Sequence, residues 1–351
     1  MANAKPVRVG IIGCGFFAPN HVHSWAQMPG VEIAALCDLN EEKARQLAER
    51  TGIMAPVFAN VAAMIDQAKP DFIDIITSPE THPDLVAFAA ERRMPTIVQK
   101  PMSLDFAASR KMVDAMAKAK VPFMVHENFR FQAPIREVGK IVRSGEIGRP
   151  TYAIISFRTG YDIYAGQPYL AKIKRFVLLD LGVHVLDVAR FILGEAERVH
   201  CEVQSVKPGI AGEDMASMLV RHTEGAMSVV ECSYFSPLAD DPFPETLISV
   251  EGTDGAVTLS AGYNIAVRSG DKIRRLNGDA KVLPWASKPW HVVQDSVLRT
   301  QEHWLDCFRR GVEPEISGRD NLATLALVEA SYESVANRTS ARPVLIAGKN
   351  A

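Results

Sequence analysis

VRVGIIGCGFFA, residues 7–18, is the stretch of sequence that decides the fold. Its apolar start predicts a buried strand, and Gly13, Gly15 and Ala18 then stand where a dinucleotide-binding turn needs small residues. The first glycine permits the tight turn, the second lets a pyrophosphate approach the backbone, and the small third residue lets the next helix pack closely. The alternative is a plain strand-to-helix turn, because glycine-rich turns are common.

Asp38 follows the next apolar run, residues 31–37, at the spacing where an acidic residue binds the ribose of a dinucleotide. A carboxylate there accepts a hydrogen bond from a free 2′-hydroxyl and repels a 2′-phosphate, so the sequence favours NAD over NADP. Asp38 and Asn40 also have the chemistry to cap the following helix, and both roles are compatible. Lys43 and Arg45 lie further along and could still reach a phosphate.

The composition is that of an ordinary globular chain of 351 residues, which is enough for about two domains. A net charge of −2 and the lack of a Lys/Arg run argue against a nucleic-acid or anionic-membrane partner. No apolar stretch approaches the length of a membrane span, and the start of the chain lacks a signal-peptide core, so we expect a cytoplasmic protein. The five scattered cysteines predict small buried side chains and no disulfide framework.

The pattern of apolar residues differs between two parts of the chain. Residues 1–125 alternate short apolar runs with helical segments, which predicts an α/β Rossmann domain with a parallel sheet covered on both faces. Residues 126–351 show strands of period two and predict an α+β domain with a large, mostly antiparallel open sheet. The strands expected there are 151–158, 200–206, 216–223, 226–235, 246–252 and 256–261, and the helices are about 178–193, 292–310 and 321–337.

Ligands of open parallel sheets bind beyond the carboxyl ends of the strands, so the segments that follow each strand are candidates. Polar residues arrive there in three places, at 77–83, at 99–101 and at 126–128. The first is explained equally well by a turn and a helix start. The lysine of the second could simply be solvated, as most lysines are.

Residues 178–193 read as a helix with Asp180, His184 and Asp187 on one face and an apolar stripe on another. One alternative is a buried His-Asp pair that only serves packing. Another is a metal site, which the sequence disfavours because no third ligand has suitable spacing and because His21 and His23, two residues apart, would not face each other in a helix.

Together these motifs resemble the Gfo/Idh/MocA family (glucose-fructose oxidoreductase, inositol dehydrogenase and rhizopine catabolism proteins) over essentially the whole chain. The family's glycine-rich turn is GCGFFA, its Glu-Lys-Pro appears as Gln99-Lys100-Pro101, and its Asp-x-Gly-x-His-x-x-Asp helix is residues 180–187. The resemblance implies NAD(P)-dependent oxidation of a sugar or polyol hydroxyl, with Lys100, Asp180 and His184 as the catalytic set. It also implies homodimers or homotetramers built through the open sheet.

Two departures from the family pattern bear on the site. Gln99 replaces the usual glutamate, so a carboxylate beside Lys100 is missing and a proton relay through it is in doubt. Residues 172–176 carry three cations where the family often has small residues, which suggests a polyhydroxylated or partly anionic substrate. Within the family, the chain looks similar to dehydrogenases of pentoses such as D-apiose, with oxidation to a lactone; an inositol-type cyclic polyol is the alternative substrate.

Oxidation of a hydroxyl carbon needs a base for the hydroxyl proton and a cation for the developing alkoxide, and we assign these roles to His184 and Lys100. Asp180 would orient His184 or bind a substrate hydroxyl, and Asp187 would anchor the helix. The cofactor-binding candidates are Gly13, Gly15, Phe16, Phe17, Asp38, Thr77, Ser78, His82, Gln99, Lys100 and Asn128, and the substrate-binding candidates are His126, Arg158, Tyr161, Asp162, Tyr164, Lys174 and His291. No metal is expected. The competing hypothesis from another class is a non-catalytic sensor that keeps the dinucleotide site and binds a regulatory partner.

Overall fold

The computed structural model describes residues 5–344, and its chain contacts divide into two compact units. Of the described residues, 5–127 and 297–322 belong to unit 1, and 128–296 and 323–344 belong to unit 2. The sequence places one boundary between residues 125 and 126, whereas the chain also returns to unit 1 near its end. This return joins a late helical segment to the first unit, which a pattern of local periodicity does not reveal.

Unit 1 is built on a six-stranded parallel sheet with the order β3-β2-β1-β4-β5-β6. Since β1 and β4 are neighbours, the chain order reverses between them, and this is the switch point where doubly wound sheets bind ligands. The α/β Rossmann prediction is confirmed. The strands are β1 (Val7–Ile12), β2 (Val31–Cys37), β3 (Val57–Phe58), β4 (Phe72–Ile75), β5 (Thr96–Gln99) and β6 (Phe123–His126).

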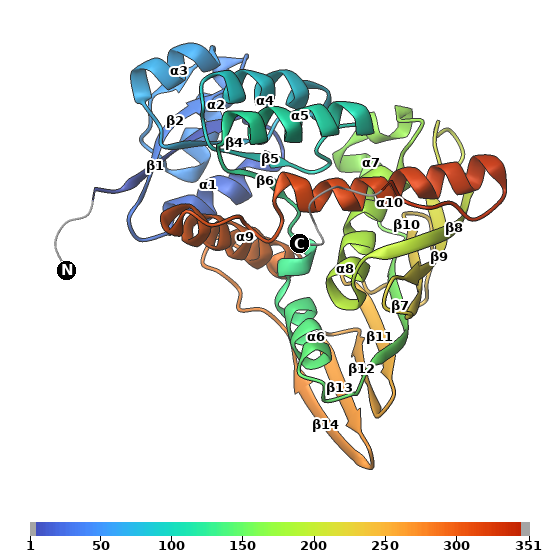
Figure 1. The fold of residues 1–351 in the computed structure, drawn as a ribbon. Helices are drawn as coiled ribbons and strands as arrows, with labels where there is room; N and C mark the ends of the chain where they lie inside the picture. The colour runs from blue at the N-terminus through green and yellow to red at the C-terminus, as the bar shows by residue number, and fades with distance from the viewer. Residues whose placement is uncertain (1–4, 345–351) are drawn as a thin grey trace. The chain divides into compact units, whose positions relative to one another are not determined.

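Helices lie on both faces of this sheet, and Figure 1 shows α4 and α5 side by side. On the other face, Trp25 of α1 and Trp304 of α9 both contact Phe72 of β4, with ring centroids 5.2 and 5.5 Å away. These three fully buried rings form the centre of the core on that side. The helices are α1 (Ala18–Ala26), α2 (Glu41–Thr51), α3 (Val61–Ala68), α4 (His82–Glu91) and α5 (Phe106–Ala119), with a 3-10 turn at Pro79–Thr81.

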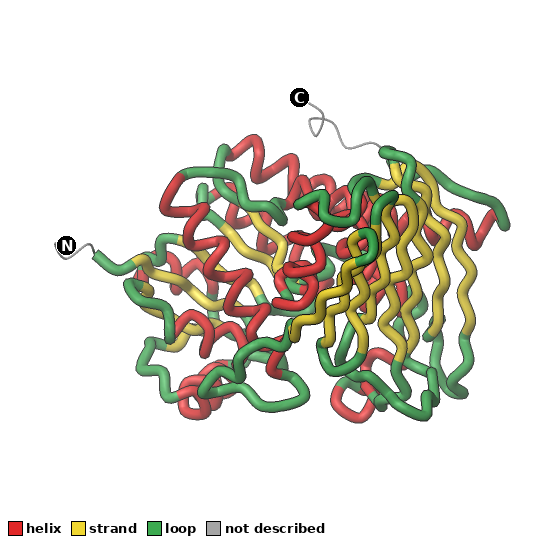
Figure 2. Tube along the Cα trace, turned by 90° about the horizontal axis from the view of Figure 1, so that it is seen from below, coloured by secondary structure: helices red, strands yellow, loops and turns green. Residues whose placement is uncertain are grey.

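Unit 2 is built on an eight-stranded sheet with the order β14-β13-β12-β11-β7-β10-β9-β8, whose strands run side by side in Figure 2. Every neighbouring pair is antiparallel except β7 and β10, so the expected mostly antiparallel sheet is confirmed. The strands are β7 (Pro150–Arg158), β8 (Ala196–Gln204), β9 (Met215–His222), β10 (Met227–Ser233), β11 (Leu247–Gly252), β12 (Gly255–Ser260), β13 (Asn264–Ser269) and β14 (Lys272–Asn277).

Helix α8 packs on the β7 and β10 region of that sheet, and α6 packs against β12. The helical elements of unit 2 are α6 (Ala133–Arg143), α7 (Ile163–Gly166), a π turn (Leu178–Gly182), α8 (Val183–Leu193) and the 3-10 turns Phe129–Phe131 and Pro168–Lys172. The division between the units falls inside α9 (His291–Arg310) and α10 (Gly318–Asn337). Among residues 5–344, no helix has both the length and the apolar character needed to cross a membrane.

The single α-helix expected over residues 178–193 is wrong at its start, where the chain forms the π turn. A distant side chain shapes this start, because Glu213 Oε1 accepts hydrogen bonds from the backbone nitrogens of Phe176 and Leu178 at 3.0 and 3.3 Å. Gly182 ends the π turn, and a Cβ there would lie 3.3 Å from the Leu178 side chain and 3.4 Å from the Val177 carbonyl. Single π turns in helices are often found at functional sites.

Candidate active site

The glycine-rich turn of unit 1 has the geometry that a dinucleotide requires. Gly13 has a φ of +95°, and a Cβ there would lie 2.8 Å from the Ile76 backbone, so both conformation and space demand glycine. A Cβ at Gly15 would meet nothing within 4 Å, which leaves the backbone open to a pyrophosphate. The Ala18 side chain is fully buried at the start of α1. This turn therefore fits NAD.

Asp38 stands directly beside the turn. Its Oδ2 accepts a hydrogen bond from the Cys14 backbone nitrogen, and its Oδ1 accepts one from the Asn40 backbone nitrogen, both at 2.9 Å. Asn40 also caps α2, since its Oδ1 accepts from the Glu42 backbone nitrogen at 3.1 Å. The carboxylate is thus held in place by the chain, with lone pairs left for a ribose hydroxyl.

A pocket of about 410 Å³ opens beside this turn, lined by Cys14, Gly15, Phe16, Lys43, Gln46, Leu47 and Arg50. Phe16 is 70 % exposed, so its ring is available to a ligand. Lys43 and Arg50 supply two cations, whereas Arg45 is held by ion pairs to Glu41 and Glu42. Phe17 is half-buried, and its ring lies 5.6 Å from that of His21.

His82 joins the loops that follow β4 and β5. Its Nε2 lies 3.1 Å from the Thr77 carbonyl, and its Nδ1 lies 3.2 and 3.1 Å from the carbonyls of Pro101 and Met102. Burial lowers the pKa of this fully buried imidazole, although the three carbonyls act in the opposite direction. The histidine therefore organises the backbone of these loops, and the Ser78 side chain stays exposed.

Lys100 follows β5 and is half-buried. Its backbone nitrogen donates to Gln99 Oε1 at 2.7 Å, and Gln99 Nε2 lies 3.1 Å from His21 Nε2. His21 in turn contacts Asp74 of β4 through Nδ1 at 2.8 Å. His126, at the end of β6, is fully buried with its ring 4.2 Å from that of His21. The sequence did not single out Asp74.

Asp180 and His184 lie in unit 2, in the π turn and in the first turn of α8. The Tyr234 hydroxyl donates to Asp180 Oδ2 at 2.9 Å, and burial together with the Asp180 charge raises the pKa of Tyr234 well above its ordinary value. The His184 ring stacks on Phe129, with centroids 3.9 Å apart and planes 7° apart. The phenol stays protonated and orients the carboxylate, while Phe129 fixes the plane of the imidazole.

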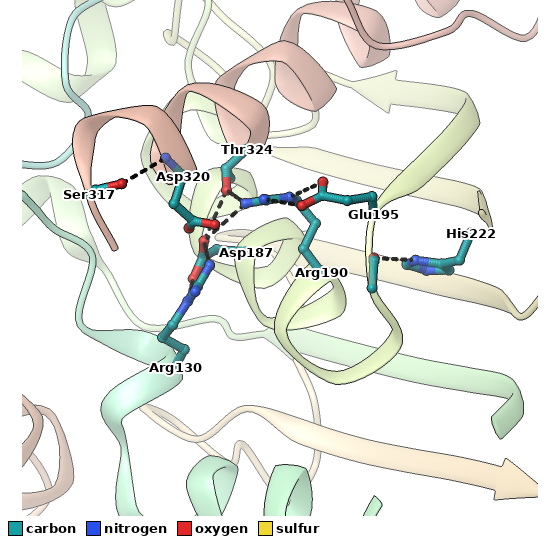
Figure 3. A network of polar contacts seen from close by, with 9 residues as sticks. Arg130, Asp187, Arg190, Glu195, His222, Ser317, Asp320 and Thr324 are labelled. Carbon is teal, nitrogen blue, oxygen red and sulfur yellow. Dashed lines mark hydrogen bonds and ion pairs between the residues drawn. The ribbon is translucent and has the colours of Figure 1, made fainter. Parts of the chain in front are cut away.

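Asp187 belongs to a buried ion-pair network, shown in Figure 3. Arg130 donates to both of its oxygens, at 2.6 and 2.5 Å, and the Thr324 hydroxyl donates to Oδ1 at 2.9 Å. Arg190 lies 3.7 Å from the same carboxylate and also pairs with Glu195. Asp187 therefore anchors α8, as the sequence indicated, by joining it to Arg130 and to α10.

Two of the substrate candidates near β7 have side-chain hydrogen-bond partners, and a third has a buried hydroxyl. Arg158 Nε donates to Ser236 Oγ at 3.3 Å, and Asp162 Oδ1 caps α7 by accepting from the Tyr164 backbone nitrogen at 3.1 Å. Among the described residues, the buried Tyr164 hydroxyl has no hydrogen-bond partner, and burial raises its pKa to about 12.

The remaining candidates differ in exposure. Tyr161 is 46 % exposed and stacks on Phe243 at 4.1 Å, and Lys174 is exposed. His291 is buried and bonded to Asp279 at 2.6 Å, which gives it a local packing role.

Asn128 falls in unit 2, where its Nδ2 donates to Ser296 Oγ at 2.6 Å. Sequence reasoning also missed Phe129, Tyr234 and Glu213, since each is recognisable only through a contact distant in sequence.

Comparison with known proteins agrees with this description. Residues 7–127 match the model of the oxidoreductase family with an NAD-binding Rossmann fold (GFO_IDH_MocA), and residues 135–258 match the GFO/IDH/MocA C-terminal domain. The chain is 46 % identical over 330 residues to a D-apiose dehydrogenase of Paraburkholderia graminis, covering 94 % of this chain and 88 % of that protein. It is 43 % identical over 335 residues to a D-apiose dehydrogenase of Rhizobium rhizogenes, covering 95 % and 97 %.

Among solved structures, an oxidoreductase from Agrobacterium radiobacter in complex with NAD⁺, L-tartaric acid and magnesium superposes with a TM-score of 0.93 at 43 % identity, covering 96 % of this chain and 98 % of that one. The chain belongs to the Gfo/Idh/MocA oxidoreductase family. Within that family it is an NAD-dependent dehydrogenase, so the expectation of NAD as the cofactor is confirmed.

Proposed function

We propose that the protein oxidises the anomeric hydroxyl of a pentose such as D-apiose to a lactone, with NAD as the hydride acceptor. The similarity to two D-apiose dehydrogenases along nearly the whole chain is the observation that carries this proposal. In the reaction the carbon gives a hydride to the nicotinamide, the hydroxyl gives a proton to a base, and the carbon-oxygen bond becomes a carbonyl.

Lys100, Asp180 and His184 are the proposed catalytic residues. His184, held flat on Phe129, accepts the hydroxyl proton, and Lys100 stabilises the negative charge that develops on the oxygen. Asp180, oriented by Tyr234, binds a substrate hydroxyl or aligns His184.

The cofactor-binding residues proposed from the sequence remain as stated, with residues 1–125 as the NAD-binding domain. Residues 126–351 are the proposed substrate-binding and oligomerisation domain, apart from residues 297–322, which belong to unit 1.

A panel of pentoses, hexoses and cyclic polyols, followed by NADH absorbance at 340 nm, tests the substrate. The expected result is turnover of D-apiose at the highest kcat/KM and release of a lactone. Faster turnover of myo-inositol would instead support the cyclic-polyol alternative. NAD binding without turnover of any compound, together with capture of a specific partner, would support the sensor hypothesis.

The catalytic assignment is tested by Lys100→Met and His184→Ala, with NAD binding and circular dichroism as controls. Loss of a general acid-base group costs about two to four orders of magnitude in rate. Each variant is therefore expected to bind NAD while kcat falls by that amount. Near-full turnover of either variant would remove that residue from the catalytic set.

We also propose a homodimer or homotetramer assembled through the outer face of the eight-stranded sheet. Ile154 pairs in register with Val229, and Val229 with Leu219, so apolar side chains lie in one row across three strands; Ile154 and Leu219 are 40 % and 50 % exposed. Light scattering after size exclusion is expected to give an oligomer for the natural chain and a smaller species for Leu219→Glu. A monomeric natural chain would refute this.

The expected cytoplasmic location is retained as a proposal. Its support is that all five cysteines are buried free thiols, as proteins of reducing compartments keep them. Fractionation of the native host, with the activity in the cytoplasmic fraction, is the test.

A further inference from the structure

Three polar side chains form a continuous buried chain in unit 1 that ends at the backbone of Lys100. We propose that Asp74, His21 and Gln99 are positioning residues that hold the Lys100 backbone in place and that carry no transferable proton. These three side chains then offer no path for a proton between Lys100 and Asp74. This inference rests on the proposed function, because it takes Lys100 as the residue that acts on the substrate.

The chain begins at Asp74, whose side chain is fully buried in β4. Asp74 Oδ2 lies 2.8 Å from His21 Nδ1 and also accepts a hydrogen bond from Trp25 Nε1 at 2.8 Å. His21 and Trp25 both belong to α1 and are fully buried. A buried carboxyl group is costly unless its oxygens are hydrogen-bonded, and α1 supplies two donors to Oδ2. The contact between His21 and Asp74 therefore connects α1, the helix after the glycine-rich turn, to β4 in the middle of the sheet.

The second half of the chain fixes which atoms carry protons. Gln99 Oε1 accepts from the Lys100 backbone nitrogen at 2.7 Å, so the amide nitrogen of Gln99 is the atom that faces His21 Nε2 at 3.1 Å. An amide nitrogen only donates, and His21 Nε2 must therefore be the acceptor. Nδ1 then carries the hydrogen that is donated to Asp74. The contacts to Asp74 and to Gln99 are both satisfied when His21 carries a hydrogen on Nδ1 and none on Nε2.

The identity of residue 99 decides whether this chain holds a mobile proton. An ionised glutamate there would present only acceptor oxygens to His21 Nε2, and the imidazole would then need a second hydrogen, lying as an imidazolium between two carboxylates. The Gln99 amide instead donates its own hydrogen to His21 Nε2, so that nitrogen does not need to be protonated. Gln99 thus replaces a titratable group with a fixed donor and acceptor while it keeps the bond to the Lys100 backbone.

Nitrogen NMR of the protein labelled with ¹⁵N-histidine tests the protonation pattern directly, without reference to activity. The His21 signals are identified by their loss in His21→Gln. In the natural chain we expect a protonated Nδ1 and an unprotonated Nε2, and in Gln99→Glu both nitrogens protonated. His23→Gln, a change two residues away on the same helix, is the matched control and is expected to leave the pattern unchanged. A proton on His21 Nε2 in the natural chain would overturn the proposal.

Kinetics test the positioning role. Asp74→Asn keeps the size of the side chain but removes the charge that holds His21, and a catalytic group displaced by about 1 Å can cost about 100-fold in rate. We expect kcat to fall by about 10- to 100-fold with the NAD dissociation constant and the sugar KM within about twofold, and Gln99→Glu to add a new ionisation to the pH profile of kcat. If Asp74→Asn only lowers the melting temperature and leaves kcat unchanged, the network is structural and the proposal fails.

The two proposals fail separately. Full activity of Lys100→Met would refute the proposed function while the His21 protonation pattern stayed as it is. A wrong pattern at His21 would refute the positioning network while Lys100→Met still abolished turnover.

Discussion

Asp187 offers the sharpest test of how unit 2 holds the helix that carries His184. In Asp187→Asn the shape is kept, but Arg130 and Arg190 lose their common carboxylate. Their side chains are only 5 % and 3 % exposed, so water cannot replace it. Breaking a buried ion pair from one side costs about 3–5 kcal/mol, which for a unit of this size lowers the melting temperature by about 6–20 °C.

Differential scanning calorimetry measures this, and Glu195→Gln is the matched control. Glu195 pairs with Arg190 as well, yet its side chain is 43 % exposed, so its removal is expected to cost only about 0–1 kcal/mol. The two substitutions remove the same kind of charge from the same arginine at different burial. Equal shifts in melting temperature for both variants would show that burial does not govern this network, and our reasoning would be wrong.

Asp38→Ala is expected to weaken NAD binding by about 10- to 100-fold, the value of a hydrogen bond to a charged group, and to bring NADP closer to NAD in a fluorescence titration because Lys43 lines the neighbouring pocket. Tighter NADP binding by the natural chain would contradict this. Burial lowers the pKa of His82 and of His222, so both are neutral in the folded chain; the stability they contribute is present above pH 6.5 and is lost as the pH falls below it. Urea unfolding at pH 7.5 and 5.5 checks the sign. Burial, and to a smaller extent the Asp38 charge, raises the pKa of the Cys14 thiol to about 12. We therefore expect this thiol to resist iodoacetamide at pH 8 until the chain is unfolded, and rapid labelling of the folded chain would contradict this.

The sequence predicted most elements of the first unit because its strands are apolar on both faces and its turns carry glycine in required conformations. Gly13 is an example, since the motif predicted a tight turn there, and the structure shows a positive φ and a close Ile76 backbone that both require glycine. Strands β13 and β14 were not predicted; β14 is KIRRLN, with no buried residue and hence no alternating pattern to recognise. Helix α6 was also passed over, although Pro134 in its first turn is a normal start signal.

The shape of the helix start at Asp180 could not be read from local spacing. Three polar residues at positions 180, 184 and 187 suggested one face of a continuous α-helix, but the π turn separates the first from the other two. Its cause, the Glu213 carboxylate on the backbone of Phe176 and Leu178, lies more than thirty residues away in sequence. Tertiary contacts of this kind override local propensity, and a single sequence does not display them.

Gln99 shows what a structure adds to a departure from a family motif. The sequence alone showed that the family's carboxylate beside Lys100 is missing, which left a proton relay in doubt. It did not show which group, if any, takes the place of that carboxylate. The contacts show that a carboxylate is present two groups further in, at Asp74, and that His21 and the Gln99 amide connect it to the Lys100 backbone. The Gln99 amide keeps the hydrogen-bonded connection between His21 and the Lys100 backbone, because its nitrogen donates to His21 and its oxygen accepts from Lys100. It adds no group that can take up or release a proton. The substitution of glutamine for the family's glutamate at position 99 is therefore compatible with the buried side chains around it. The direction of the hydrogen bond between Gln99 and His21 makes this compatibility testable.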